Sequence, residues 1–153
     1  MAFGGCRAER SIPPASAADS AMAAGFQALM TTTVQTPPAP VLFCLDMENP
    51  AFQQDPTSGA PQHLKPPPAV FKLLEDGSHP VYPTSWCAES TNRGRSRQGA
   101  WIAIDHLLPL SPDSVLVSAD VARGPSGFSY QCNVTRAGGR WHPGPCRQTG
   151  IIN

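Results

Sequence analysis

The chain has 153 residues, enough for one domain, and its eleven basic and eleven acidic residues give a formal net charge of zero. A neutral chain lacks the basic surface that nucleic-acid-binding proteins need, so we expect no nucleic acid partner. It also lacks an apolar run of about 18 residues, so we expect no membrane-spanning segment. Eighteen prolines and thirteen glycines, with few aromatic residues, predict a mostly irregular chain of low order.

Residues 1–35 are predicted to form a flexible tail with one marginal helix at 16–30. Apolar residues recur there at helical spacing, and Ser16 with Asp19 resembles a capping box. Gly25 costs about 1 kcal/mol relative to alanine in a helix interior. We expect a fraying helix that docks on whatever core exists, with a partner-binding or targeting helix as the alternative. No clear signal peptide precedes it, and the sequence assigns no compartment.

Residues 36–68 are predicted to be a proline-rich linker, because nine of the eighteen prolines lie there. Proline fixes the backbone dihedral φ and removes a backbone donor, so neither a helix nor a central strand is expected to run through this segment. The one apolar island, VLFCL at 41–45, is a candidate for a short strand.

Residues 69–135 are predicted to be a small β-rich segment. Apolar and polar side chains alternate over 114–122 and again over 127–135, and Gly and Pro residues lie between the two runs. This pattern predicts a β-hairpin spanning 114–135. Residues 136–153 are broken by glycine and proline and are predicted to be a second flexible tail.

Four residues follow the order of the immunoglobulin-like signature: Cys87, Trp101, Tyr130 and Cys132. The segment 66–150 therefore resembles a short immunoglobulin-like domain. The resemblance implies an extracellular binding module in which Cys87 forms a disulfide with Cys132 under oxidising conditions. Asn133 begins an Asn-Val-Thr glycosylation sequon, which would be used if the protein is secreted.

A second resemblance is to the papain-like thiol hydrolases, which include viral leader peptidases and ubiquitin-specific proteases. It lies in Gly-Ser-His at 77–79 and Trp-Ile-Ala-Ile-Asp at 101–105. It implies that His79 is the general base and that Asp105 orients its ring. Cys44 is the internal upstream candidate for the nucleophile.

No cofactor or metal site is predicted. The sequence has no glycine-rich phosphate loop and no paired cysteine motif, and no two acidic residues share a predicted face. An arginine-rich stretch at 90–99 is interpreted as a solvated loop, with phosphate contact as the alternative. The scattered potential ligands are His79, Cys87, His106, Cys132, His142 and Cys146.

No specific biochemical function can be read from these patterns. The leading hypothesis is a non-enzymatic chain that acts, if at all, by binding proteins, or an orphan reading frame with little selected structure. The immunoglobulin-like extracellular module and the papain-like thiol hydrolase are the two alternatives. The five cysteines are an odd number, so an oxidised framework would leave one thiol over.

Overall fold

A computed structural model describes residues 15–48 and 63–152. Within these ranges the chain forms four helices and a seven-stranded mixed sheet, so the prediction of a mostly irregular chain is wrong. The helices are α1 (Ala17–Val34), α2 (Pro68–Leu74), α3 (Thr84–Ala88) and α4 (Arg93–Ser96). The strands are β1 (Phe43–Glu48), β2 (His63–Leu64), β3 (Val81–Pro83), β4 (Ala100–Ser111), β5 (Ser114–Arg123), β6 (Ser126–Ala137) and β7 (Arg140–Ile152).

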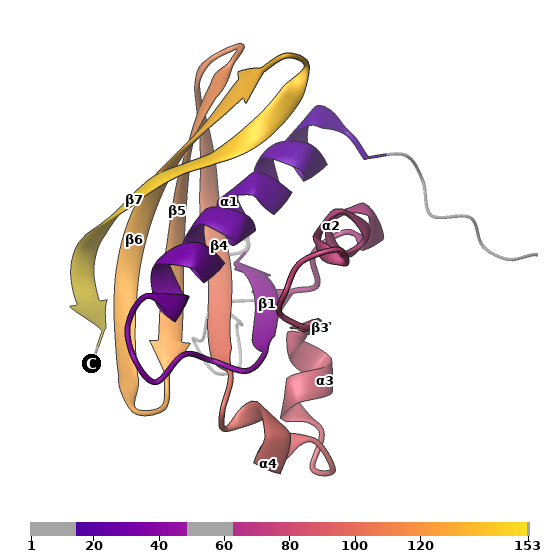
Figure 1. The fold of residues 1–153 in the computed structure, drawn as a ribbon, viewed down its shortest axis with the longest axis vertical. Helices are drawn as coiled ribbons and strands as arrows, with labels where there is room; N and C mark the ends of the chain where they lie inside the picture. The colour runs from indigo at the N-terminus through magenta and orange to yellow at the C-terminus, as the bar shows by residue number, and fades with distance from the viewer. Residues whose placement is uncertain (1–14, 49–62, 153) are drawn as a thin grey trace, which may run out of the picture.

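The main path through the sheet has the order β2-β1-β4-β5-β6-β7. Strands β4 to β7 form an antiparallel meander, whereas β1 pairs with β4 in parallel. On its other side β1 pairs with the short strands β2 and β3 at successive positions along its length. Figure 1 shows α1 lying across one face of this sheet, with α2 and α3 on the side of β1 and β3, and α4 below them where the chain enters β4.

The expected helix is present but is longer and more deeply buried than its sequence predicts. Its capping box has two hydrogen bonds: Ser16 N donates to Asp19 Oδ2 at 3.0 Å, and Asp19 N donates to Ser16 Oγ at 3.1 Å. A Cβ added to Gly25 would lie 3.0 Å from the two Cγ atoms of Val117. The glycine that weakens the isolated helix therefore allows α1 to approach β5 closely.

The hydrophobic core lies between α1 and the sheet. Apolar side chains on alternate positions of β4, β5 and β6 face the helix, which is the periodicity of strands with one covered face. Because these positions are fully buried, α1 is held by packing and does not depend on its own marginal propensity. The fully buried side chains include Phe26, Leu29, Phe43, Leu45, Ile102, Val117, Val121 and Val134.

The first half of the predicted linker contains an inner strand of the sheet. The apolar island at 41–45 leads into β1, in which Phe43, Cys44 and Leu45 are completely buried. The neighbouring prolines lie outside the strand, so β1 itself contains no proline to interrupt its hydrogen bonds. The predictions for residues 1–14 and 49–62 fall outside the described residues.

The predicted hairpin and the predicted C-terminal tail both belong to the larger sheet. β5 and β6 pair antiparallel with Val117 opposite Cys132, but β4 and β7 extend the sheet on either side of them. β7 occupies the segment expected to be a flexible tail. Pro143 and Pro145 are tolerated in it because β7 is an edge strand, where one side needs no ladder partner.

Within the described part of the chain, no helix combines the length and the hydrophobicity needed to cross a membrane.

Candidate functional site

The sequence resemblances implied a disulfide between Cys87 and Cys132 or a nucleophilic Cys44. The structure has two different disulfides instead. Cys44 is bonded to Cys87, and Cys132 is bonded to Cys146. The bond implied between Cys87 and Cys132 is not formed, because each of these residues has another partner. The immunoglobulin-like fold is likewise replaced, since α1 covers a single mixed sheet where that fold would pack two sheets together.

The first disulfide joins β1 to α3 and lies in a small second core beside the main one. Cys44 and Cys87 pack there with Leu42, and the rings of Trp86 and Trp101 cover them in part. The second disulfide is a cross-strand pair between β6 and β7, buried on the side of the sheet that α1 covers. It ties the edge strand, which has a register shift on either side of the bond, to its neighbour.

The three residues implied for a thiol hydrolase do not meet. Cys44 has no free thiol, because it is held in the disulfide. His79 lies beside the start of β1, where its ring meets the ring of Phe43 edge-on at 5.6 Å between centroids. Asp105 follows Ile104, which pairs with Met47 near the other end of β1. No base–orienter pair is formed between His79 and Asp105.

His79 instead lines a cavity of about 680 Å³ between α2 and β3. Its Nδ1 lies 3.0 Å from the hydroxyl of Ser78, the preceding residue. The same cavity is lined by Lys72, which pairs with Glu75 at 3.0 Å on the surface of α2. The side chains of Lys72 and Glu75 are more than half exposed, so this pair contributes little to stability.

Three carboxylates converge on the sheet, contrary to the expectation that no acidic residues share a face. One oxygen from each of Glu48, Asp105 and Asp120 lies within 4.8 Å of the other two. Asp120 lies between Ala119 and Val121, which are buried under α1, so its own side chain is on the opposite face. The hydroxyl of Ser129 donates to Asp120 Oδ1 at 2.7 Å.

Asp105 is the member of this carboxylate cluster whose surroundings disfavour the charged form. It lies where the register between β4 and β5 shifts, at a β-bulge between Ile104 and His106. Burial, and secondly the charge of Asp120, raise the pKa of Asp105 above its ordinary value. Its Oδ1 is inaccessible and has no hydrogen-bond partner among the described residues.

A divalent cation fits the same geometry. Calcium takes about six to eight oxygen ligands, of which these three side chains supply a part. The sequence contains one usable signal for the cluster. Glu48 and Asp120 each occupy a polar position in a stretch where apolar and polar residues alternate. The bulge that brings Asp105 beside them leaves no local signature.

Asn133, the predicted glycosylation residue, lies on β6 with an exposed side chain. It is next to the buried Cys132 and Val134, so the strand alternation directs it away from the core. The sequon is therefore accessible on the sheet face opposite α1, and its use stays a prediction.

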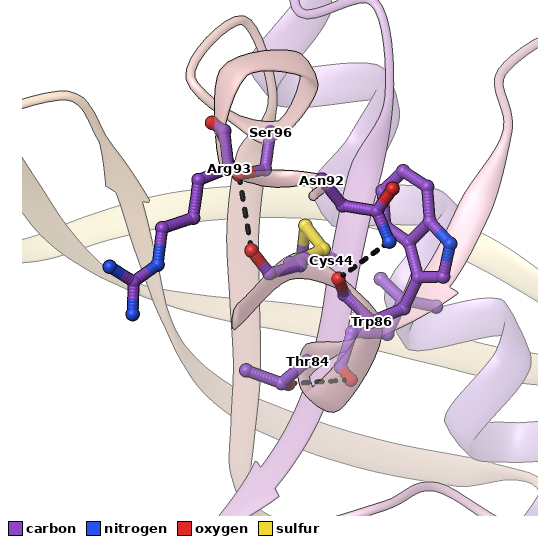
Figure 2. The surroundings of a disulfide bond; sticks show 8 residues. Cys44, Thr84, Trp86, Asn92, Arg93 and Ser96 are labelled. Carbon is purple, nitrogen blue, oxygen red and sulfur yellow. Dashed lines mark hydrogen bonds between the residues drawn. A yellow bond between two sulfur atoms is a disulfide. The ribbon is translucent and has the colours of Figure 1, made fainter. Parts of the chain in front are cut away.

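The disulfide between Cys44 and Cys87 lies next to the corner that α3 and α4 form, and hydrogen bonds hold this corner in place. Figure 2 shows the hydrogen bonds that hold this corner. Asn92 Nδ2 donates to the carbonyl of Trp86 at 3.3 Å, and the buried Ser96 hydroxyl donates to the carbonyl of Cys87 at 3.2 Å. Thr84 Oγ1 donates to the carbonyl of Leu45 at 3.0 Å, which ties α3 back to β1.

Beside this corner is a cavity of about 550 Å³, which we call the arginine pocket. Arg93 and Arg97 of the α4 turn lie on one side of it and Trp101 of β4 on another, and Cys87 also lines it. From the sequence, this stretch is interpreted as a solvated loop, with phosphate contact as the alternative. The spacing of the arginines does not show that two of them line a common cavity.

Comparisons of the chain with protein-family models, with curated proteins and with solved structures gave no match. The function is therefore argued from the residues of this chain.

Proposed function

We propose that the protein is a non-enzymatic binding module that works in an oxidising compartment. The observation that carries the proposal is the pair of disulfides, which uses four of the five cysteines. Such bonds form and persist in secreted and other oxidising environments and are rare where glutathione keeps thiols reduced.

The non-enzymatic part of the proposal is supported by the fate of Cys44. This residue is the nucleophile that the hydrolase resemblance requires, and its sulfur is bonded to Cys87. A thiolate is the reactive form of cysteine, so a sulfur held in a buried disulfide offers no nucleophile. The separation of His79 from Asp105 removes the arrangement that would activate it. That the partner is a protein, as the sequence analysis supposes, stays a prediction.

The test is peptide mapping without reduction, on full-length protein equilibrated in a glutathione buffer. The buffer is set to about −200 mV, near the poise of the endoplasmic reticulum. We expect the peptides of Cys44 and Cys87 to be linked, and those of Cys132 and Cys146 to be linked. If these four cysteines stay free while the protein remains folded, the assignment to an oxidising compartment is wrong.

A second measurement addresses catalysis. A peptide vinyl sulfone, which alkylates active-site thiols, should leave Cys44 unlabelled in the oxidised protein. Labelling of Cys44 that is abolished by His79→Ala would overturn the non-enzymatic proposal, because it would require a working base and a free nucleophile.

A further inference from the structure

The arginine pocket carries a charge that nothing in its lining neutralises. Arg93 and Arg97 are its two charged lining residues, and none of the lining residues that the structure describes is acidic. Neither arginine forms an ion pair with a described residue. The other described lining residues include four of small size, namely Ala88, Gly99, Ala122 and Gly124.

The position of the arginines on the helical turn decides which of them face the cavity. Arg93 and Arg97 are four residues apart, which places them on the same side of a helical turn, and Arg97 N donates to Arg93 O at 3.2 Å. Arg95 lies between them and does not line the pocket. Arg95 is therefore an internal control, because it is on the same short turn but outside the lining of the pocket.

The walls of the pocket are held in place before any ligand arrives. Ser96 lies between the two arginines in the turn and is buried, with its hydroxyl bonded to Cys87 O at 3.2 Å and to Arg93 O at 3.0 Å. Arg93 Nε donates to Ala88 O at 3.3 Å, which orients its guanidinium while leaving the two terminal nitrogens free for a ligand. In Figure 2 the Arg93 side chain extends away from the disulfide corner.

Guanidinium groups bind carboxylate and phosphate through paired, charge-assisted hydrogen bonds. Trp101 adds a flat apolar surface that is half-buried against the Cys44–Cys87 disulfide. A cavity of this volume is within the range of small-molecule sites. The combination of two exposed arginines, an aromatic wall and otherwise uncharged lining residues favours a ligand with one anionic group and one flat apolar group.

We propose that the arginine pocket binds a small organic anion, with its phosphate or carboxylate on Arg93 and Arg97 and its apolar part on Trp101. This inference rests on the proposed binding function and names the ligand class of that module. A carboxylate and a phosphate monoester share the chemistry that the arginines recognise, so the experiment distinguishes between them.

The experiment is a titration of the oxidised full-length protein with phenyl phosphate, benzoate and inorganic phosphate, followed by amide and indole NMR shifts. We expect saturable shifts for residues of α4 and for the Trp101 indole N–H with phenyl phosphate or benzoate. Inorganic phosphate should bind at least about threefold more weakly, because it has no group to contact Trp101. Raising the salt concentration should weaken all three interactions.

Arg97→Gln is the principal variant, because the Arg97 side chain forms no hydrogen bond with any described residue. We expect the dissociation constant to rise about tenfold or more, which corresponds to about 1.4 kcal/mol. Arg95→Gln is the matched control and should leave the dissociation constant unchanged. Arg93→Gln should also weaken binding, and its amide spectrum shows whether the corner has kept its structure.

The outcomes separate this inference from the proposed function. Intact disulfides in the peptide map together with no saturable shift at millimolar ligand overturn the pocket and leave the proposed function standing. Equal losses in Arg95→Gln and Arg97→Gln overturn the assignment to the pocket, since they would report general attraction to a basic turn. Equal affinity for phenyl phosphate and inorganic phosphate overturns the role of Trp101.

Discussion

Asp105 shows how one residue can carry an unfavourable interaction in a stable fold. Its neighbour Ile104 in β4 is buried and apolar, whereas His106 is exposed. The bulge leaves the Asp105 carboxylate close to Asp120 without a hydrogen bond to Oδ1 among the described residues. Both circumstances favour the protonated form, so the pKa of Asp105 is higher in the folded protein than in the unfolded chain. A group of this kind makes stability depend on pH.

The sign of that dependence follows from proton binding. Between the unfolded and the folded pKa of Asp105, the folded protein binds more protons, so its stability falls as the pH rises. The penalty is fully present above the folded pKa and is absent below the unfolded value of 3.8. We predict that Asp105→Asn raises the thermal unfolding midpoint at pH 7, and that the gain shrinks as the pH is lowered towards 4.

Thermal unfolding followed by circular dichroism between pH 4 and pH 7 measures this effect. Asp76→Asn is the control, because Asp76 is exposed at the end of α2 and should change the midpoint little at any pH. A lower midpoint for Asp105→Asn at pH 7 would contradict the prediction. It would mean that the charged carboxylate is stabilised by a partner such as a bound cation, and added calcium or EDTA would then shift the wild-type midpoint.

At the scale of elements, the end of α1 depends on a residue 90 positions away in sequence. α1 has no basic residue in its last turn to bind its unpaired carbonyl groups. Arg123, at the end of β5, supplies that interaction: its Nη1 donates to Thr33 O at 3.3 Å and to Thr36 O at 2.9 Å. Its Nη2 also donates to Pro38 O, so one guanidinium joins the helix end, the following loop and the sheet.

We predict that Arg123→Lys destabilises the protein by about 1.5–3 kcal/mol, the range for hydrogen bonds to charged groups. Lysine keeps the charge but cannot span the three carbonyl groups with one planar fork. Urea unfolding monitored by tryptophan fluorescence gives the free energy change. Arg136→Lys is the control, because Arg136 pairs with Asp113 on the surface and such pairs contribute about 1 kcal/mol or less. Equal losses for the two variants would show that charge alone matters.

At the scale of the molecule, the two disulfides close loops of different length. The bond between Cys44 and Cys87 spans 43 residues and the bond between Cys132 and Cys146 spans 14. The longer loop contains most of the α2–α3 region and connects the inner strand β1 to a helix outside the sheet. The shorter one secures an edge strand to its immediate neighbour.

In the chain-entropy model, closing the longer loop stabilises the fold by about 4 kcal/mol and closing the shorter one by about 3 kcal/mol. We therefore predict that the double variant Cys44→Ala/Cys87→Ala loses more stability than Cys132→Ala/Cys146→Ala. Typical domains are stable by only about 5–15 kcal/mol, so a chain lacking both bonds should be largely unfolded near 37 °C. Urea unfolding of the two double variants measures the order, and the reverse order would contradict the entropic account.

The features that could be read from the sequence are those set by neighbouring residues. The capping box of Ser16 and Asp19 begins α1 where expected, because its hydrogen bonds span only three residues. The alternation over 114–122 and 127–135 matches β5 and β6, since side-chain alternation is a local property of an extended chain. No local pattern shows how many further strands join them.

The sequence by itself determined the start of the helix, the strands with strict alternation and the absence of strong charge. Tertiary structure alone decided that β1 is an inner strand of the sheet, that the predicted C-terminal tail contains β7, which cysteines pair, and which side chains share the carboxylate cluster and the arginine pocket. The physical reason is the range of the interactions. Strand pairing, disulfide formation and charge clustering depend on residues tens of positions apart, which only the folded chain brings within reach of one another.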